Sequence, residues 1–221
     1  MNRYSRQIIY WSEQFQNLLF KQSVFVAGLG GLGCIVAESL TRAGVGNIFI
    51  CDSGVIDEPD LNRQSLYNEN DLGKYKVDVA KSKLNTINSK CNIIKINRTI
   101  DKDFVFNFDN IVVFDCLDNY TSRNILFDKI PAGVYFIHAG LDAYVGQVIT
   151  LLKEKSKSIS AIFAGLKDKK NIPVTPDAVH IISGIMVREY FNILKGEPRL
   201  YEKFLIVNFE EFSLDYLYLT N

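Results

Sequence analysis

The 221-residue sequence has few cysteines, no excess of charge and no long apolar stretch, and each absence excludes a class of protein. Its four cysteines are widely spaced and form no C-x-x-C pair, so we expect reduced thiols that serve as small apolar residues. Basic and acidic residues number 25 each, which makes nucleic acid an unexpected partner. No apolar run approaches the roughly 20 residues that cross a bilayer, and the first residues lack the apolar region of a secretory signal. These absences favour a cytoplasmic protein that binds neither membranes nor nucleic acid.

The residues that are present predict an α/β protein. Hydrophobic residues make up 48% and charged residues 23% of the chain, as in ordinary globular proteins, and the length fits a single domain. After an amphipathic helix at 4–20, short apolar strands alternate with helices, which predicts a parallel sheet covered on both faces. The expected strands are 23–27, 47–51, 91–96, 110–115 and 135–138, and the expected helices are 32–43, 77–88, 101–108 and 120–129.

The alternation ends in the last third of the chain. The apolar segment 146–152 follows the previous strand so closely that an antiparallel turn is expected in place of a helical crossover. A helix is expected from Thr175, its N-cap, and Pro176, its first residue, to about residue 194. The polar, aperiodic segment before it is expected to be a mobile crossover, and it contains the lysines Lys153, Lys155, Lys157, Lys167, Lys169 and Lys170. Two strands, 204–209 and 212–219, are expected to form a final hairpin.

We therefore predict a Rossmann-like three-layer α/β fold, with a mostly parallel sheet and antiparallel strands added in the C-terminal part. A single domain, 1–221, is expected. It divides into an N-terminal helix (1–21), a core (22–150), a crossover loop (151–174) and a C-terminal helix with its hairpin (175–221).

Glycines join the first strand to the helix that follows it. Gly28, Gly30 and Gly33 have the spacing G-x-G-x-x-G, and Gly31 is an additional glycine between them. Glycines at these places allow a sharp turn and let backbone N–H groups approach a phosphate at the helix N-terminus. Asp52 ends the next strand about 20 residues after the last glycine, where an acid that hydrogen-bonds a ribose hydroxyl is expected. The pattern predicts a nucleotide site in the core.

The glycine pattern leaves alternatives open. A glycine-rich turn also serves as an ordinary tight connection, and Asp52 could cap the turn that follows its strand. The turn and the acid do not identify the nucleotide, and by themselves they permit an NAD-dependent oxidoreductase. Tighter protection by NAD than by Mg-ATP in a melting assay would favour that reading.

Five motifs in register resemble the ThiF/MoeB/HesA family, the bacterial relatives of ubiquitin-activating enzymes. They cover about two thirds of the chain and are R-Y-S-R-Q at 3–7, G-L-G-G-L-G at 28–33, D-L-N-R-Q at 60–64, Gly73 with Lys76, and Asp118-Asn119. The resemblance implies ATP-dependent adenylation of the C-terminal glycine carboxylate of a small ubiquitin-like sulfur carrier, with release of pyrophosphate. The carrier would end in Gly-Gly and be of the thiamine or molybdopterin type. The resemblance also implies a homodimer.

The resemblance assigns roles to individual residues. Arg63 and Lys76 would bind the phosphates, which suits a reaction that brings much negative charge together. Asp118 would hold Mg²⁺, and Arg6 would reach the γ-phosphate of the partner subunit's ATP as an arginine finger. The remaining nucleotide-binding residues would be Gly28, Gly30, Gly31, Gly33, Asp52, Asp60, Asn62, Gln64 and Asn119.

Plainer interpretations stand beside these roles. Arg6, Arg63 and Lys76 could be solvated or salt-bridged surface charges, and the Asp118-Asn119 pair could cap the helix at 120–129. The two histidines, His138 and His180, are isolated, and each is expected to be packed rather than catalytic. The chain could also be an inactive scaffold for another adenylating subunit, although a scaffold has no physical need for the charged set.

The sequence departs from the family in its cysteines. Many members bind a structural zinc through two C-x-x-C pairs, but no cysteine follows Cys116 here, so no structural zinc is expected. The crossover cysteine that some relatives use for a covalent carrier link is missing as well. Cys116 lies at the end of an apolar strand, where a thiol is expected to be a poor nucleophile. We therefore expect adenylation without a thioester step on this chain, with sulfur supplied from elsewhere.

Overall fold

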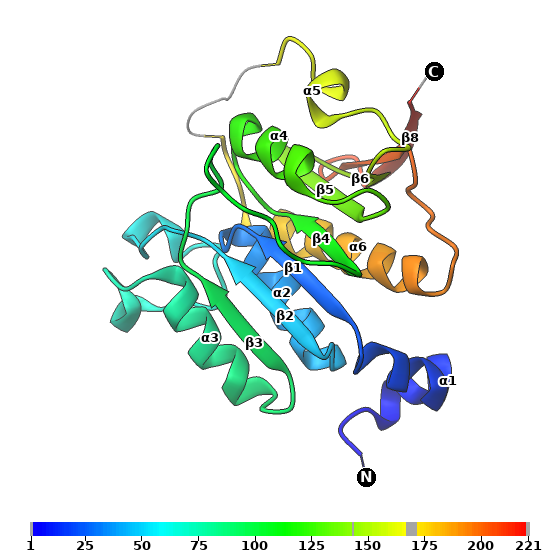
Figure 1. Ribbon diagram of the computed structural model, residues 1–221. Coiled ribbons are helices and arrows are strands. Elements are labelled where there is room, and N and C mark those ends of the chain that lie inside the picture. The colour runs from blue at the N-terminus through cyan, green and yellow to red at the C-terminus, as the bar shows by residue number, and fades with distance from the viewer. Residues whose placement is uncertain (1, 143, 167–171, 220–221) are drawn as a thin grey trace.

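The computed structural model describes residues 2–142, 144–166 and 172–219. These residues form an eight-stranded sheet in the order β3-β2-β1-β4-β5-β6-β7-β8 (Figure 1). Its strands are β1 Ser23–Ala27, β2 Asn47–Cys51, β3 Asn92–Ile96, β4 Ile111–Asp115, β5 Tyr135–Asp142, β6 Val145–Leu152, β7 Lys203–Asn208 and β8 Ser213–Tyr218. The strands β3, β2, β1, β4 and β5 run parallel, and β6, β7 and β8 join antiparallel. The predicted fold class and the antiparallel C-terminal strands are confirmed.

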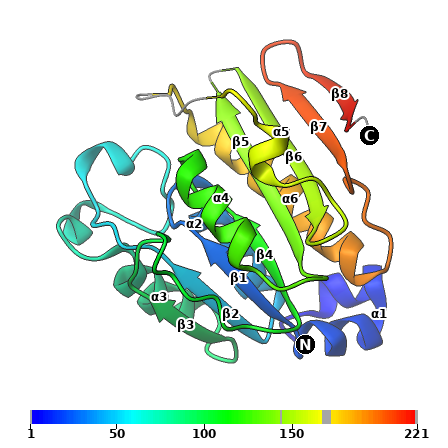
Figure 2. The ribbon, with the colours of Figure 1, turned by 45° about the horizontal axis from the view of Figure 1, so that its top comes forward.

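Helices cover both faces of the sheet. α2 (Gly31–Ala43), α3 (Lys76–Ile87) and α6 (Pro176–Leu194) share one face, and α4 (Tyr120–Lys129) and the short α5 (Ile159–Ile162) lie on the other (Figure 2). The parallel strands are apolar on both sides because both faces are covered; every residue of β4 is buried. Among the described residues, every helix is too short or too polar to cross a membrane.

The N-terminal helix α1 (Ser5–Leu19) lies at the edge of the sheet where the strands begin. The side chains of Gln7 and Gln16 both donate to the carbonyl of Ala43, the last residue of α2. The expected helix at 4–20 is kinked, because Ser12 has a left-handed backbone with φ of 79°. The kink lets Trp11 pack edge-on against Phe191 of α6, with 5.0 Å between ring centroids.

The helix predicted at 101–108 is wrong. This segment has no helical hydrogen-bond ladder, and Phe104, Phe106 and Phe108 each pack against Phe25 of β1. Rings two residues apart reach one surface only from an extended backbone. Burial of the Phe104 ring stabilises by roughly 2 kcal/mol, and the partly buried rings of Phe106 and Phe108 add to this, which outweighs helix preferences of less than about 1 kcal/mol per residue.

The C-terminal third matches its prediction with two differences. The crossover is not wholly irregular, since Ser158 caps α5 by accepting from the backbone N–H of Ala161. Thr175 occupies the N-cap position of α6, but its side chain forms no capping hydrogen bond. The predicted lysines Lys167, Lys169 and Lys170 lie outside the described residues.

Candidate active site

The glycine turn lies where β1 enters α2, at the carboxyl edge of the sheet. Gly28 has φ of +87°, and a Cβ there would lie 2.7 Å from the carbonyl oxygen of Cys116. A Cβ on Gly33 would lie 1.9 Å from the carbonyl oxygen of Gly28. Both positions therefore exclude side chains on steric grounds, before any ligand is considered.

Gly30 and Gly31 have different neighbours. A Cβ on Gly30 would meet only Gln64, at 3.8 Å, so this residue opens toward the cleft. A Cβ on Gly31 would lie 3.1 Å from Val179 of α6 and 3.4 Å from Cγ of Arg63. We expected Gly31 to keep the start of the helix free for phosphate; the structure adds that Gly31 lets α6 and Arg63 approach the turn.

Asp52, at the end of β2, ties the turn to the next loop. Its Oδ2 accepts a hydrogen bond of 2.7 Å from the N–H of Leu29, and its Oδ1 accepts one of 2.7 Å from the N–H of Gly54. The turn-capping alternative is therefore realised. The side chain also lines the cleft, so binding a ribose hydroxyl remains a prediction that the turn contacts do not exclude.

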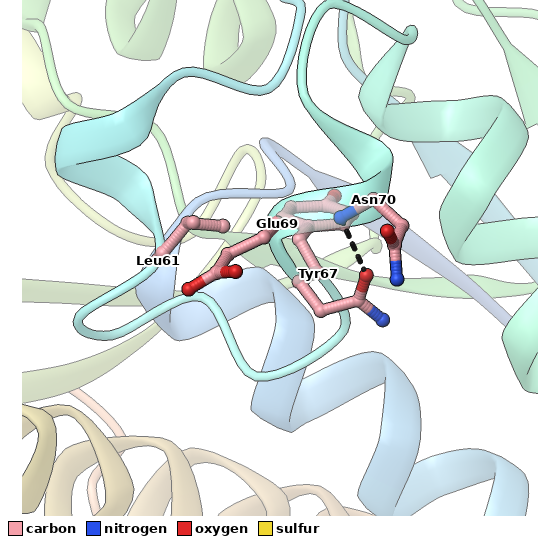
Figure 3. A pocket seen from close by; sticks show the side chains of 5 residues that line it. Leu61, Tyr67, Glu69 and Asn70 are labelled. Carbon is pink, nitrogen blue, oxygen red and sulfur yellow. Dashed lines mark hydrogen bonds between the residues drawn. The ribbon is translucent and has the colours of Figure 1, made fainter.

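A cleft of about 990 Å³ opens at this edge of the sheet. It brings together nearly all the predicted site residues, from five separate parts of the chain: Gly28, Gly30, Gly31, Asp52, Asp60, Arg63, Gln64, Lys76, Asp118 and Asn119. A second hollow of about 370 Å³, beside Leu61, Tyr67 and Glu69, contains none of them (Figure 3). The cleft is therefore the candidate active site.

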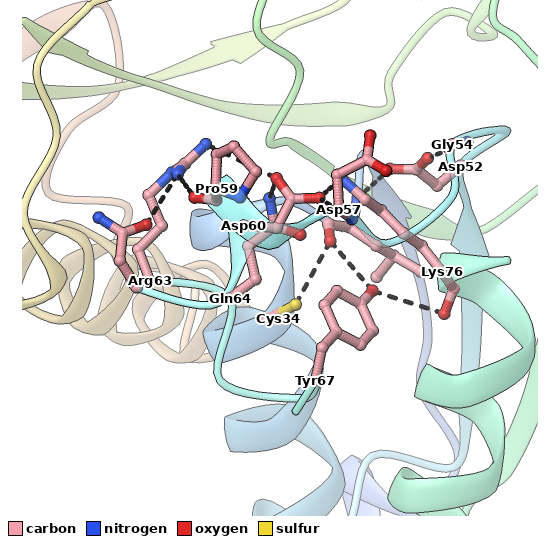
Figure 4. Close-up of polar contacts among 12 residues, drawn as sticks. Cys34, Asp52, Gly54, Asp57, Pro59, Asp60, Arg63, Gln64, Tyr67 and Lys76 are labelled. Atoms are coloured by element: carbon pink, nitrogen blue, oxygen red, sulfur yellow. Dashed lines mark hydrogen bonds and ion pairs between the residues drawn. The ribbon is translucent and has the colours of Figure 1, made fainter. Parts of the chain in front are cut away.

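Asp60 is the centre of the charged network on one wall (Figure 4). Its carboxylate lies 3.0 Å from Nζ of Lys76 and 3.9 Å from Nη2 of Arg63. It also accepts a hydrogen bond of 2.6 Å from Nε2 of Gln64. Arg63 also donates to Oδ1 of Asn62 at 2.9 Å. The carboxylate thus holds both predicted phosphate-binding cations at the cleft wall.

Two of the predicted polar residues, Asn62 and Gln64, have surroundings that differ from those expected of nucleotide-binding residues. Asn62 is exposed, lies outside the lining of the cleft and contacts Arg63, so it orients a cation rather than facing the cleft. Gln64 is 98% buried, and its Oε1 has no hydrogen-bond partner among the described residues. An unpaired buried oxygen beside a cleft is suited to accept from a ligand or an ordered water.

The part of the cleft lining that follows β4 carries the predicted metal ligand. Asp118 is exposed in the cleft, and its Oδ1 accepts a hydrogen bond of 3.1 Å from Nδ2 of Asn119. Asn119 caps α4 by accepting a hydrogen bond of 2.8 Å from the N–H of Ser122. The capping alternative therefore holds for Asn119, and Asp118 is available for another role. Within the described residues no three acidic, histidine or cysteine side chains cluster as a metal cage. One carboxylate fits Mg²⁺ that is held mainly by nucleotide phosphates.

Two predicted residues lie away from the cleft. Arg6 is exposed on α1, at the end of the sheet opposite to the cleft, and forms no ion pair within the described part of the chain. His180 is exposed on α6, where Nδ1 bonds the carbonyl of Pro176 at 2.7 Å, so the expectation that it is packed is wrong. His138 is fully buried, as expected.

Sequence reasoning missed Tyr67. Its hydroxyl donates to the carbonyl of Leu29 at 3.1 Å and lies 3.4 Å from the carbonyl of Lys76. It therefore connects the glycine turn with the start of α3, two segments that carry predicted phosphate ligands. The aperiodic loop around Tyr67 gave no signal for this contact.

All four cysteines are buried and free. Burial raises the pKa of Cys34 and Cys51 to about 12 and that of Cys91 to about 11, and it raises the pKa of Cys116 well above its ordinary value. A thiol in its protonated form is a weak nucleophile.

These thiols should resist alkylation in the folded protein. At pH 7 we expect no rapid adduct with a small maleimide, and four adducts after unfolding in guanidinium, as counted by intact mass. Rapid labelling of Cys116 in the folded protein would contradict the expectation that this chain has no nucleophilic cysteine.

A parallel sheet with a glycine turn and a charged cleft at its carboxyl edge defines a Rossmann-like protein. The chain belongs to the ThiF family, whose sequence model matches residues 4–220. It is 36% identical over 139 residues to the molybdopterin-synthase adenylyltransferase of Salmonella typhimurium, covering 61% of this chain and 54% of that protein. It is 39% identical over 130 residues to the enzyme of the same name from Haemophilus influenzae, covering 56% of this chain and 53% of that protein.

Two further comparisons extend the similarity in sequence and in fold. The SAMP-activating enzyme E1 of Haloferax volcanii is 29% identical over 159 residues, which cover 70% of this chain and 59% of that protein. Escherichia coli MccB, crystallised with ATP, shares the fold with a TM-score of 0.82 and 20% identity, over 100% of this chain and 72% of that one. The chain spans about half the length of the molybdopterin-synthase adenylyltransferases that it matches.

Proposed function

We propose that this protein adenylates the C-terminal glycine carboxylate of a small ubiquitin-like sulfur carrier, using ATP and releasing pyrophosphate. The observation that carries the proposal is the cleft itself. It brings the glycine turn together with the two predicted phosphate-binding cations, Arg63 and Lys76, and with the predicted metal ligand, Asp118. A hydride-transfer enzyme would leave these three charges without a role. The names of the adenylyltransferase relatives agree with the proposal.

The chemistry requires neutralisation of charge. A carboxylate attacks the α-phosphate while pyrophosphate leaves, so an anion approaches a triphosphate that is itself strongly anionic. The first turn of α2 offers backbone N–H groups that its own helix does not use. Lys76 and Arg63 would exchange part of their contact with Asp60 for phosphate oxygens, and stabilise the charge that passes to the leaving group.

Asp118 would hold Mg²⁺ on the phosphates from the part of the cleft lining that follows β4. When bound, the metal would neutralise the triphosphate and orient the leaving group. Asn119 would keep the Asp118 carboxylate turned toward the cleft through its 3.1 Å hydrogen bond.

We propose that the active unit is a homodimer. Arg6 lies at the end of the sheet away from the cleft of its own chain, so it would act on the ATP of a second copy. A closed two-fold dimer would give each of its two clefts one such arginine.

The carrier tail would enter along the apolar part of the cleft lining, which includes Leu141, Val145, Leu166 and Val174. A tail of two glycines is narrow and without side chains, as a passage to the α-phosphate between these walls requires. The buried thiols support adenylation without a thioester on this chain, with sulfur supplied from elsewhere, and they agree with a reducing, cytoplasmic location.

Exchange of labelled pyrophosphate into ATP tests the proposal, because reversal of adenylation returns the label to ATP. We expect exchange with a carrier of the thiamine or molybdopterin type that ends in Gly-Gly. The matched control is the same carrier without its last glycine.

A further inference from the structure

A largely buried charged cluster adjoins the cleft, and one of its members, Arg123, is among the residues that line the cleft. Asp115, the last residue of β4, is fully buried, and its Oδ2 lies 2.6 Å from Nδ1 of His138, which is also fully buried, on β5. The same oxygen lies 3.5 Å from Nε of Arg123, on α4, whose side chain is about 10% exposed. The other carboxylate oxygen of Asp115, Oδ1, accepts a hydrogen bond of 3.2 Å from the N–H of Leu117.

The charges in this cluster compensate one another. Burial lowers the pKa of His138 below its ordinary value, although the Asp115 carboxylate acts in the opposite direction, so the imidazole is neutral at pH 7. A neutral imidazole can donate from Nδ1, and we assign its proton there because a carboxylate only accepts. Arg123 is therefore the cation that balances Asp115. A buried carboxylate without such a partner is strongly unfavourable.

Arg123 does more than balance charge. Its Nη2 donates to the carbonyl of Leu117 and, at 3.2 Å, to the carbonyl of Ala139 on β5. The N–H of Leu117 is held by Asp115, so the pair holds Leu117 on both its N–H and its carbonyl side. The next residue is Asp118. The exposed carboxylate of Asp118 therefore projects from a backbone that is fixed to both β4 and β5.

We propose that Arg123 and Asp115 are positioning residues that hold Asp118 where it binds the Mg²⁺ of Mg-ATP. The inference deepens the proposed function, since it concerns the metal role given there to Asp118. The planar guanidinium of Arg123 reaches a carboxylate and two carbonyls together, whereas the ammonium of a lysine, a point charge, would balance Asp115 without the same fixed geometry. Residues that orient a metal ligand commonly change metal affinity 10- to 100-fold when altered.

The test is the gain in ATP affinity that Mg²⁺ provides, measured by calorimetry with Mg²⁺ and with EDTA. We expect Arg123→Lys to reduce this gain at least about tenfold and to leave the metal-free affinity within about twofold. Asp118→Asn should remove the same gain. Arg42→Lys is the matched control, because Arg42 is exposed and paired with Glu38, away from the cleft, and it should keep the full gain.

The outcomes separate positioning from a purely structural role. Arg123→Lys with a lower melting temperature but an undiminished gain from Mg²⁺ would overturn the proposal, and so would wild-type protein whose ATP affinity does not respond to Mg²⁺. Should Arg123→Lys fail to fold, Asp115→Asn is measured instead, because it keeps the size of the side chain and removes its charge. Pyrophosphate exchange by the wild-type protein tests the proposed function separately, because the calorimetric gain does not require a carrier.

Discussion

Asp118→Ala is expected to lower carrier-dependent ATP–pyrophosphate exchange at least about 100-fold. Asp118 lines the same cleft as Lys76 and Arg63, and its removal would take away the proposed protein ligand of Mg²⁺ on the phosphates. Its side chain is exposed and, within the described part of the chain, makes one hydrogen bond, to the side chain of Asn119, so the fold should be unchanged. The exchange rate and the far-UV circular dichroism spectrum measure the two parts of this expectation.

The matched control for this variant is Asp128→Ala. Asp128 is an exposed aspartate on the same connection, near the end of α4, and it does not line the cleft. Its replacement should leave exchange within about twofold of wild type, as surface substitutions away from special features do. Asp118→Ala protein that retains more than a tenth of the wild-type rate would refute the metal role.

Mixing Arg6→Ala protein with Asp118→Ala protein is expected to restore activity that neither has alone. In a mixed dimer, one cleft would have an intact Asp118 and receive Arg6 from the other copy. If subunits exchange freely, half of the dimers are mixed and each has one complete cleft, so exchange should return to about a quarter of the wild-type rate.

Two controls give this complementation its meaning. Each variant mixed only with protein of its own kind should stay inactive, and Arg42→Ala should be active alone because Arg42 is an exposed arginine that, among the described residues, pairs with Glu38. Full activity of Arg6→Ala protein by itself would show that Arg6 is an ordinary surface residue. Two inactive variants that stay inactive after proven subunit exchange would contradict a shared site.

Hydrophobic patterning was sufficient to predict the sheet. The boundaries of β1, β2 and α4 agree with prediction to the residue, because apolar strands lie between clear polar or glycine breaks. The short connection before β6 predicted its antiparallel direction for a geometric reason, since a helical crossover needs more residues.

Tertiary contacts decided the places where prediction failed. The segment 101–108 is extended because three phenylalanines reach the same ring of Phe25, and no local pattern identifies that target. Ser12 kinks α1 where Trp11 meets α6. His180 is exposed because its side of α6 faces away from the sheet. The first two outcomes depend on a partner far away in the sequence.

The site was predicted through its motifs and not through its supporting contacts. Motif spacing identified Arg63, Lys76 and Asp118, and the fold brings all three to one cleft. Arg123 and Tyr67 were not identified, since each acts through backbone carbonyls that any residue could provide. Such contacts leave no residue pattern in a single sequence.

Pyrophosphate exchange with paired carriers tests the central claim most directly. The wild-type protein is mixed with Mg-ATP, labelled pyrophosphate and a small ubiquitin-like carrier of the thiamine or molybdopterin type, with and without its C-terminal Gly-Gly. We predict that label enters ATP only when the intact carrier is present. Protein that binds ATP but gives no exchange with any Gly-Gly carrier would contradict adenylation, and protein that binds no ATP would favour an inactive scaffold.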